Sequence, residues 1–158
     1  MDDAATLITK LRQDAERFVA YMQSINEDTR TKVVYTEGGP WTVRSVLIHL
    51  RSAEREFLRL FRDIQHGGSG VDETFNIDDF NADEQAREAQ LSWEEALSSF
   101  LETRRSMLDL IGTFTSDDLE KTGRHPYLGA TSLREMIKMI YIHDQTHLRD
   151  IRRAVGAG

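Results

Sequence analysis

The chain contains no cysteine, which excludes disulfide bonds, thiolate metal ligands and a cysteine nucleophile. Any metal site must therefore be built from histidine and carboxylate side chains. No apolar run approaches the ~20 residues that a membrane-spanning helix needs. The acidic start Met1–Ala4 also lacks the apolar stretch of a signal peptide. These absences lead us to expect a cytoplasmic protein with no membrane partner.

Proline is scarce and positive charge is in deficit. Pro40 and Pro126 are the only prolines and both fall in expected loops, which leaves long segments free to form helices. The net charge is −7. Because phosphate backbones and anionic lipids bind basic faces, we expect no nucleic-acid partner. The 39% hydrophobic and 30% charged residues are typical of a globular protein, and we expect residues 1–158 to form a single domain.

Four long segments have apolar residues at helical spacing. The first covers residues 3–25, with Asp14 on its polar side. The second begins with Thr42 as its N-cap and runs to about Gln65, where glycines follow. The third covers 80–111, and a capping box within it predicts a short helix leading into a longer one. The fourth covers 132–156.

The connecting segments contain no convincing strand. Lys32–Tyr35 is β-prone, but a lone strand has no partner, so we expect an extended connector. Residues 113–131 are expected to be mostly loop. The predicted fold class is therefore all-α, a four-helix bundle. The connection between the second and third helices is long enough to let those helices run parallel.

Two histidines lie four residues apart in the last predicted helix, His143 and His147, and therefore share one face of it. Met136 and Ile140 precede them on that face. Because these two are core residues, the histidine pair is predicted to point inward. His49 lies on or beside the apolar stripe of the second helix, within about a turn of the pair in either relative direction of the two helices.

Three neutral imidazoles with an open position can bind a divalent transition metal, and three protein ligands plus water is the pattern of catalytic sites. Such an ion lowers the pKa of a bound water or thiol and polarises a substrate oxygen. Asp144, Glu54, Glu56 and Tyr141 are candidates for holding the ring N–H groups. The alternative is that each histidine is buried and hydrogen-bonded to a neighbouring side chain without a metal.

The remaining candidates have structural interpretations. Trp41 and Trp93 are expected to pack at a helix start and in the core, although Trp41 could also rim a pocket near His49. His66 and His125 are expected in solvated loops. Arginines near the end of the last helix suit its dipole, and one of them is an alternative contact for a substrate anion: Arg149, Arg152 and Arg153.

Three stretches together resemble the pattern of the DinB-like superfamily. A tryptophan, Trp41, opens the second helix and His49 follows eight residues later. Phe80-Asn81 comes next, and an HxxxH motif lies in residues 143–151. The resemblance covers nearly the whole chain in order and length. It implies a four-helix bundle with unusual connections, and a metal held by the histidines of these motifs with water completing the shell: His49, His143 and His147.

Members of this family bind nickel, zinc or iron, and many are homodimers. Relatives use low-molecular-weight thiols such as bacillithiol or mycothiol, as S-transferases or as a maleylpyruvate isomerase. Our leading hypothesis is therefore a divalent-metal-dependent thiol transferase acting on a small-molecule substrate, with such a thiol as a further cofactor. The alternatives are a hydrolase or isomerase using the same ion, a non-catalytic metal- or small-molecule-binding stress-response protein, and a bundle whose histidines are merely packed.

Overall fold

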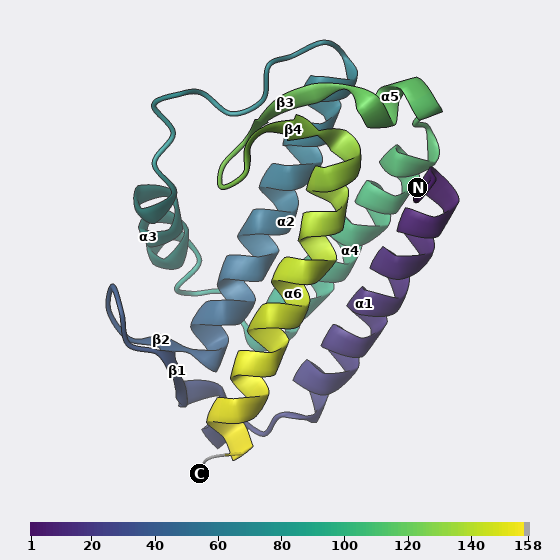
Figure 1. The fold of residues 1–158 in the computed structure, drawn as a ribbon. Helices are drawn as coiled ribbons and strands as arrows, with labels where there is room; N and C mark the ends of the chain where they lie inside the picture. The colour runs from purple at the N-terminus through teal and green to yellow at the C-terminus, as the bar shows by residue number, and fades with distance from the viewer. Residues whose placement is uncertain (157–158) are drawn as a thin grey trace.

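Four long helices form the body of the computed structural model, which describes residues 1–156 (Figure 1). The predicted all-α bundle is therefore confirmed, and the helix bounds agree with the predicted segments to within a few residues. The third segment is divided into two helices, as its internal capping box predicts. The helices are α1 (Ala4–Ser24), α2 (Val43–Gln65), α3 (Ile77–Arg87), α4 (Trp93–Gly112), α5 (Ser116–Glu120) and α6 (Leu133–Gly156), with a 3₁₀ turn at Glu27–Thr31.

Two small hairpins lie at opposite ends of the bundle, where the sequence predicted connectors and loop. β1 (Val33–Tyr35) pairs antiparallel with β2 (Trp41–Thr42), so the prediction of an unpaired connector was wrong. The partner strand is short and ends at the N-cap of α2, where sequence patterns indicate only a helix start. Between α5 and α6, β3 (Thr122–His125) pairs with β4 (Gly129–Ser132) in part of the predicted loop.

The two middle helices, α2 and α4, run parallel. At one end, Arg44 near the start of α2 donates to the carbonyl of Leu91, just before α4. At the other end, Gln65 donates to Thr113, just after α4, at 3.2 Å. The linker and α3 therefore carry the chain back along the bundle, which confirms the long connection expected from the sequence. α1 and α6 run in the opposite direction (Figure 1).

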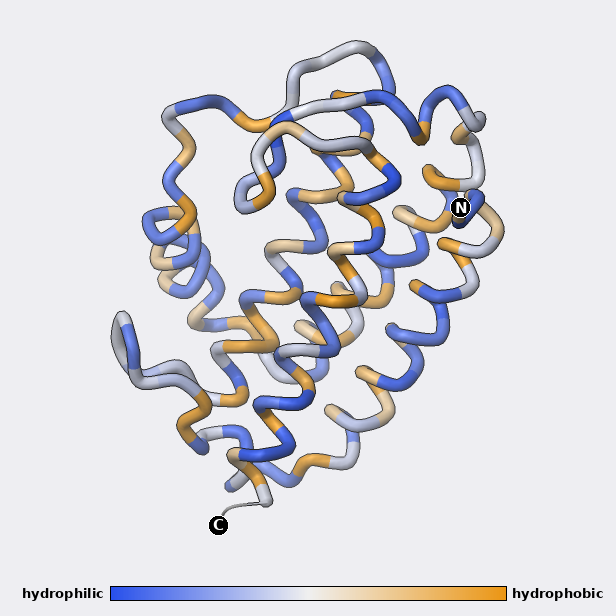
Figure 2. Tube along the Cα trace, in the orientation of Figure 1, coloured by the Kyte–Doolittle hydropathy of each residue, from blue (hydrophilic) through white to orange (hydrophobic). Residues whose placement is uncertain are grey.

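The apolar core consists of two clusters separated by a layer of charge. Polar and apolar residues alternate along each long helix (Figure 2), as burial of one face requires. One cluster lies toward the β1–β2 hairpin and includes Phe18 and Phe100, while the other includes Phe61 and Met107. Arg104 lies between Phe100 and Met107 on α4 and is itself buried. Within the described residues, no helix has the length and apolar character needed to cross a bilayer.

Candidate metal centre

The three predicted histidines meet between α2 and α6. The Nε2 atom of His143 lies 3.1 Å from Nε2 of His49 and 3.0 Å from Nε2 of His147. All three possible ligand atoms lie within 4.8 Å of one another. His49 is buried and the other two rings are half-buried. The antiparallel packing of α2 against α6 brings these positions to the same level of the bundle.

Neighbouring side chains determine which ring nitrogens carry hydrogen. Tyr35 donates its hydroxyl hydrogen to Asp150 at 2.7 Å, so its oxygen accepts from Nδ1 of His147 at 2.8 Å. Nδ1 of His49 lies 3.3 Å from Oδ1 of Asn81, an amide oxygen that can only accept. Both rings therefore carry their hydrogen on Nδ1 and present the Nε2 lone pair to the centre.

The convergence of these lone pairs fits a bound cation. Nε2 of His143 can carry at most one hydrogen, so at least one of its two close contacts joins ring nitrogens without a hydrogen between them, which is repulsive unless a cation lies there. A divalent ion binds imidazole nitrogen at about 2.1 Å, which sets its ligand atoms about 3.0 Å apart at right angles and about 3.4 Å apart at tetrahedral angles. The observed separations of 3.0 and 3.1 Å fall at the lower end of that range. An all-imidazole donor set suits zinc, nickel or iron.

Burial keeps these rings in the neutral form that binds metal. Burial first, and then the charges of the other two rings, lowers the pKa of His49 to about 3. Burial followed by the charge of His143 lowers the pKa of His147 to about 3. The pKa of His143 is also lowered by burial, against an opposing effect of Asp144. At neutral pH no ring has to lose a proton before it can bind an ion.

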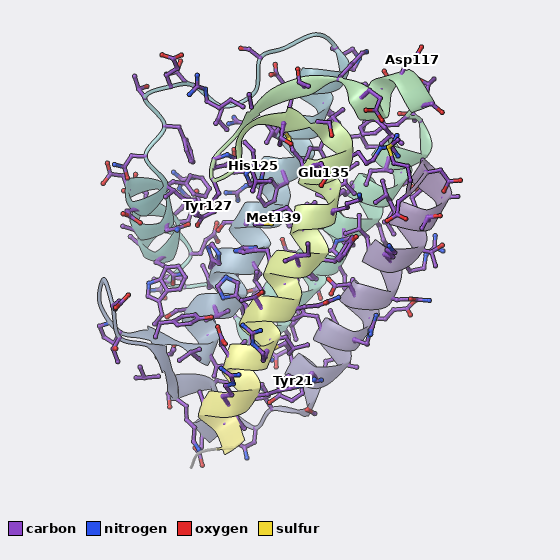
Figure 3. All side chains as sticks on the ribbon, in the orientation of Figure 1. Tyr21, Asp117, His125, Tyr127, Glu135 and Met139 are labelled. Carbon is purple, nitrogen blue, oxygen red and sulfur yellow. The ribbon has the colours of Figure 1, made fainter. Side chains whose placement is uncertain are left out.

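A cavity of about 430 Å³ opens directly beside the histidines. His49, His143 and Asn81 form its polar end, and its other walls are mostly apolar. The walls come from α2, from the linker with α3, and from the tip of the β3–β4 hairpin, where Figure 3 labels Tyr127. A mostly apolar cavity with a few converging polar groups is the usual form of a small-molecule site.

Backbone pairing holds the linker wall of this cavity in place. The amide of Arg124 donates to the carbonyl of Ser69 at 2.8 Å, and the amide of Val71 donates to the carbonyl of Arg124 at 3.0 Å. Gly70 lies between these bonds with φ +91°, and a Cβ there would collide with the backbone of Arg124. Only glycine satisfies both requirements. The linker is thereby fixed against β3 and encloses the cavity.

The charge layer of the core lies next to the histidines. Arg104 is 1% exposed and donates to Glu54, to Asp144 at 2.6 Å and to Asp14 at 3.5 Å. Each long helix thus supplies one charged side chain. Burial raises the pKa of Asp144 to about 7, although the Arg104 charge opposes this. The prediction that Asp14 lies on the polar side of its helix was wrong, because this carboxylate is 4% exposed.

None of the four side chains suggested for holding the rings contacts a ring nitrogen within the described residues. Asp144 and Glu54 bind Arg104, as stated above. Glu56 pairs with Arg59 at 2.8 Å, and the ring of Tyr141 lies under Lys10. Asn81 and Tyr35 bind the ring nitrogens instead. The Phe80-Asn81 motif was a sequence signal for Asn81. No sequence pattern pointed to Tyr35.

His125, expected in a solvated loop, is 2% exposed at the end of β3. Its ring stacks on Phe57 at 5.3 Å, and its Nδ1 accepts the amide hydrogens of Tyr127 and Leu128 at 3.1 and 3.2 Å. Burial first, and then the charge of His143, lowers the pKa of His125 to about 4. The solvated-loop prediction was therefore wrong, because the hairpin folds this ring onto α2.

The other candidates lie close to where the sequence placed them. His66 is exposed after α2. The Trp41 ring packs at 5.1 Å from that of His49, and Trp93 is buried in the core. Three arginines near the end of α6 are exposed and border a groove between α1 and α6: Arg149, Arg152 and Arg153. They do not line the cavity beside the histidines.

Solved structures of other proteins have the same fold. YfiT from Bacillus subtilis, described as a probable metal-dependent hydrolase with an unusual four-helix bundle topology, matches with a TM-score of 0.76 and 16% identity over 97% of this chain and 87% of that chain. The mycothiol-dependent maleylpyruvate isomerase matches with a TM-score of 0.78 and 11% identity, over 96% of this chain and 63% of that chain.

A third similar structure is the colibactin self-resistance protein ClbS in complex with double-stranded DNA. It matches with a TM-score of 0.70 and 14% identity, over 99% of this chain and 94% of that chain. At such identities, all three similarities establish the fold alone. No curated protein matches the sequence.

Comparison with family profiles identifies the chain at the level of its sequence. The profile of the DinB superfamily matches residues 10–151. This span includes the three converging histidines, both side chains that bind their Nδ1 atoms, and all four members of the buried charge layer. The chain therefore belongs to the DinB superfamily.

Proposed function

We propose that this protein is a divalent-metal-dependent enzyme that activates a thiol or a water molecule beside a small-molecule substrate. His49, His143 and His147 are the proposed ligands, and the adjoining cavity is the proposed substrate site. The observation that supports this most strongly is the convergence of Nε2 lone pairs at the polar end of a mostly apolar cavity. Three protein ligands leave positions for water, thiol or substrate, as in catalytic sites.

A bound divalent ion would supply Lewis-acid polarisation of a substrate oxygen and a lowered pKa for a thiol or water. The chain's own residues orient the rings. Tyr35, backed by Asp150, fixes His147, and Asn81 fixes His49. Such hydrogen bonds set the tautomer and the direction of each ligand lone pair. The apolar walls bind the substrate body and exclude bulk water.

The choice between thiol and water follows two different similarities. The mycothiol-dependent isomerase supports a thiol reaction, and YfiT supports hydrolysis. Our leading proposal is the thiol reaction, and hydrolysis is the second candidate. From the family resemblance, we also propose that the protein is a homodimer.

Metal content tests the ligand assignment. We expect wild-type protein to bind one zinc, nickel or iron ion per chain, and His49→Ala to bind none under the same conditions. His66→Ala is the matched control, because this ring is exposed outside the centre, and it should retain the ion. Elemental analysis after dialysis gives the ratio. Equally low metal content in wild type and His49→Ala would overturn the ligand assignment.

Turnover tests the catalytic part of the proposal. The metal-loaded protein is offered a panel of low-molecular-weight thiols with electrophiles, and a panel of esters and amides without thiol. We expect turnover that disappears with a chelator and returns with the metal. An inert protein that nevertheless holds one ion per chain would instead favour the non-catalytic metal-binding alternative.

A further inference from the structure

The wall of the cavity that is formed by the linker and the first turns of α3 is rich in acidic residues, two of which pair with arginines outside the cavity lining: Glu73 with Arg124 at 2.8 Å and Glu84 with Arg55 at 2.7 Å. Residues 71–84 include six acidic side chains and no basic one. Three of the neutral residues in this segment, Val71, Ile77 and Phe80, line the cavity, so the acidic side chains surround an apolar surface. The six acidic residues are Asp72, Glu73, Asp78, Asp79, Asp83 and Glu84.

The charged residues that line the cavity have the same imbalance. The charged residues in the lining are three carboxylates and one guanidinium: Glu56, Asp63, Asp72 and Arg59. The Arg59 side chain is 82% exposed and pairs with Glu56 at 2.8 Å, so its charge is already engaged by a carboxylate. An anionic ligand would therefore meet two excess carboxylates among the described lining residues.

One polar group at the inner end, the amide of Asn81, is a donor suited to a neutral acceptor. The Oδ1 atom of Asn81 faces Nδ1 of His49, which leaves the amide nitrogen of Asn81 free to donate to a ligand. Aromatic rings supply much of the remaining surface, with Phe75 and Phe80 at 5.7 Å from each other and Phe57 on α2. Phe75 is 37% exposed. The cavity thus combines apolar walls, a neutral amide donor and an excess of lining carboxylates.

We propose that this site takes an apolar, ring-sized molecule that carries a positively charged amine, and that it discriminates against carboxylates and phosphates. Charge near a cleft with low-dielectric walls focuses the field, so the lining carboxylates attract a cation and repel an anion. The inference rests on the proposed function only in assigning this cavity to the substrate. If the reaction uses a thiol, that thiol carries no excess negative charge.

Three probes of one shape and different charge test the inference: phenethylamine, phenethyl alcohol and hydrocinnamate. Binding is measured by ligand-observed NMR at low salt, on the protein as purified and again after chelation, because a carboxylate can ligate a metal directly. After chelation we expect the amine to bind most tightly and the carboxylate most weakly, with about a tenfold difference in Kd between them. Added salt should reduce the difference.

Paired variants separate charge from fold. Glu56→Gln with Asp72→Asn should bring the amine and the carboxylate to nearly equal affinity and leave the affinity for the alcohol unchanged. Asp28→Asn with Asp109→Asn removes two exposed carboxylates outside the cavity lining, and should retain the wild-type order. Phe75→Ala should weaken binding of all three probes by a similar factor.

Three results would overturn the inference. The first is hydrocinnamate binding to the chelated protein as tightly as phenethylamine. The second is an order of affinities that the cavity variants leave unchanged, and the third is absence of binding by all three probes. These outcomes are separate from failure of the proposed function, because the binding order needs neither bound metal nor turnover.

Discussion

Two polar clusters lie side by side inside this bundle, and they differ in how their hydrogen bonds are completed. In the charge layer, the donors of Arg104 meet carboxylates from the other three long helices. In the histidine cluster, the outward Nδ1 atoms of His49 and His147 have partners, while their Nε2 lone pairs both face Nε2 of His143 beside a cavity. A closed set of partners indicates a structural role, whereas converging unprotonated nitrogens indicate a binding site for a cation.

The two clusters also depend on each other through the chain. Asp144 directly follows His143 on α6, and Glu54 lies just over one turn after His49 on α2. Through these two carboxylates, Arg104 ties together the helices that carry the proposed metal ligands. The charge layer therefore fixes the relative level of α2 and α6 at the point where their histidines meet.

Removing the centre of the charge layer should have the largest effect on stability. Arg104→Met leaves up to three buried carboxylates without their cation, so we expect a loss of about 3–5 kcal/mol in the free energy of unfolding. The neighbouring Arg105 is exposed and offers a matched control. Arg105→Met should change the free energy of unfolding by less than about 0.5 kcal/mol. Denaturant titration measures both. Similar small losses in the two variants would contradict the structural role of Arg104.

Weakening the support of one histidine should have an intermediate effect. Tyr35→Phe removes the oxygen that accepts from Nδ1 of His147, and loss of such a hydrogen bond weakens metal binding about 10–100-fold. Tyr141→Phe removes a hydroxyl that makes no contact with the histidine rings, and should leave the metal Kd unchanged. Competition with a chromogenic chelator gives both constants. Equal affinities for Tyr35→Phe and wild type would show that the hydroxyl does not orient the ligand.

Acid should destabilise the fold through a buried histidine outside the metal centre, His125. His125 has a pKa of about 4 in the folded state, against about 6.5 for an unfolded chain. Between these values the unfolded chain binds more protons, so stability falls as the pH drops from about 6.5 to about 4. The slope from this one group is at most about 1.4 kcal/mol per pH unit.

His125→Asn tests this pH dependence, because its amide oxygen can replace Nδ1 as the acceptor of the two backbone amides. Unfolding is measured in urea from pH 8 to pH 4 with a chelator present, so that the other histidines contribute equally to both proteins. We expect a shallower loss of stability with acid in the variant. Parallel curves for variant and wild type would refute the assignment of this slope to His125.

The same helical spacing predicted the histidine cluster and missed the charge layer. The stripe of Met136, Ile140, His143 and His147 pointed inward correctly because its first two members are unambiguous core residues. Arg104 lies on the apolar stripe of α4, between Phe100 and Met107. A single buried charge is expensive, so sequence reasoning assigns it to the surface. Only packing of all four helices supplies the carboxylates that make its burial possible.

Contacts made by short or irregular elements could not be predicted in the same way. Tyr35 reaches His147 because β1 pairs with β2, and a strand of three residues gives little periodicity to detect. His125 is buried because a tight hairpin folds it onto α2. In both cases the position of the side chain depends on tertiary contacts of a short segment, whereas a long amphipathic helix reveals its buried face through repetition.

Anomalous diffraction from crystals grown with zinc tests the central claim most directly. We expect one peak per chain at the zinc edge, about 2.1 Å from Nε2 of each of His49, His143 and His147. The remaining positions of the ion should face the cavity. Zinc bound elsewhere, or no peak between the three rings at saturating zinc, would contradict the proposed metal centre.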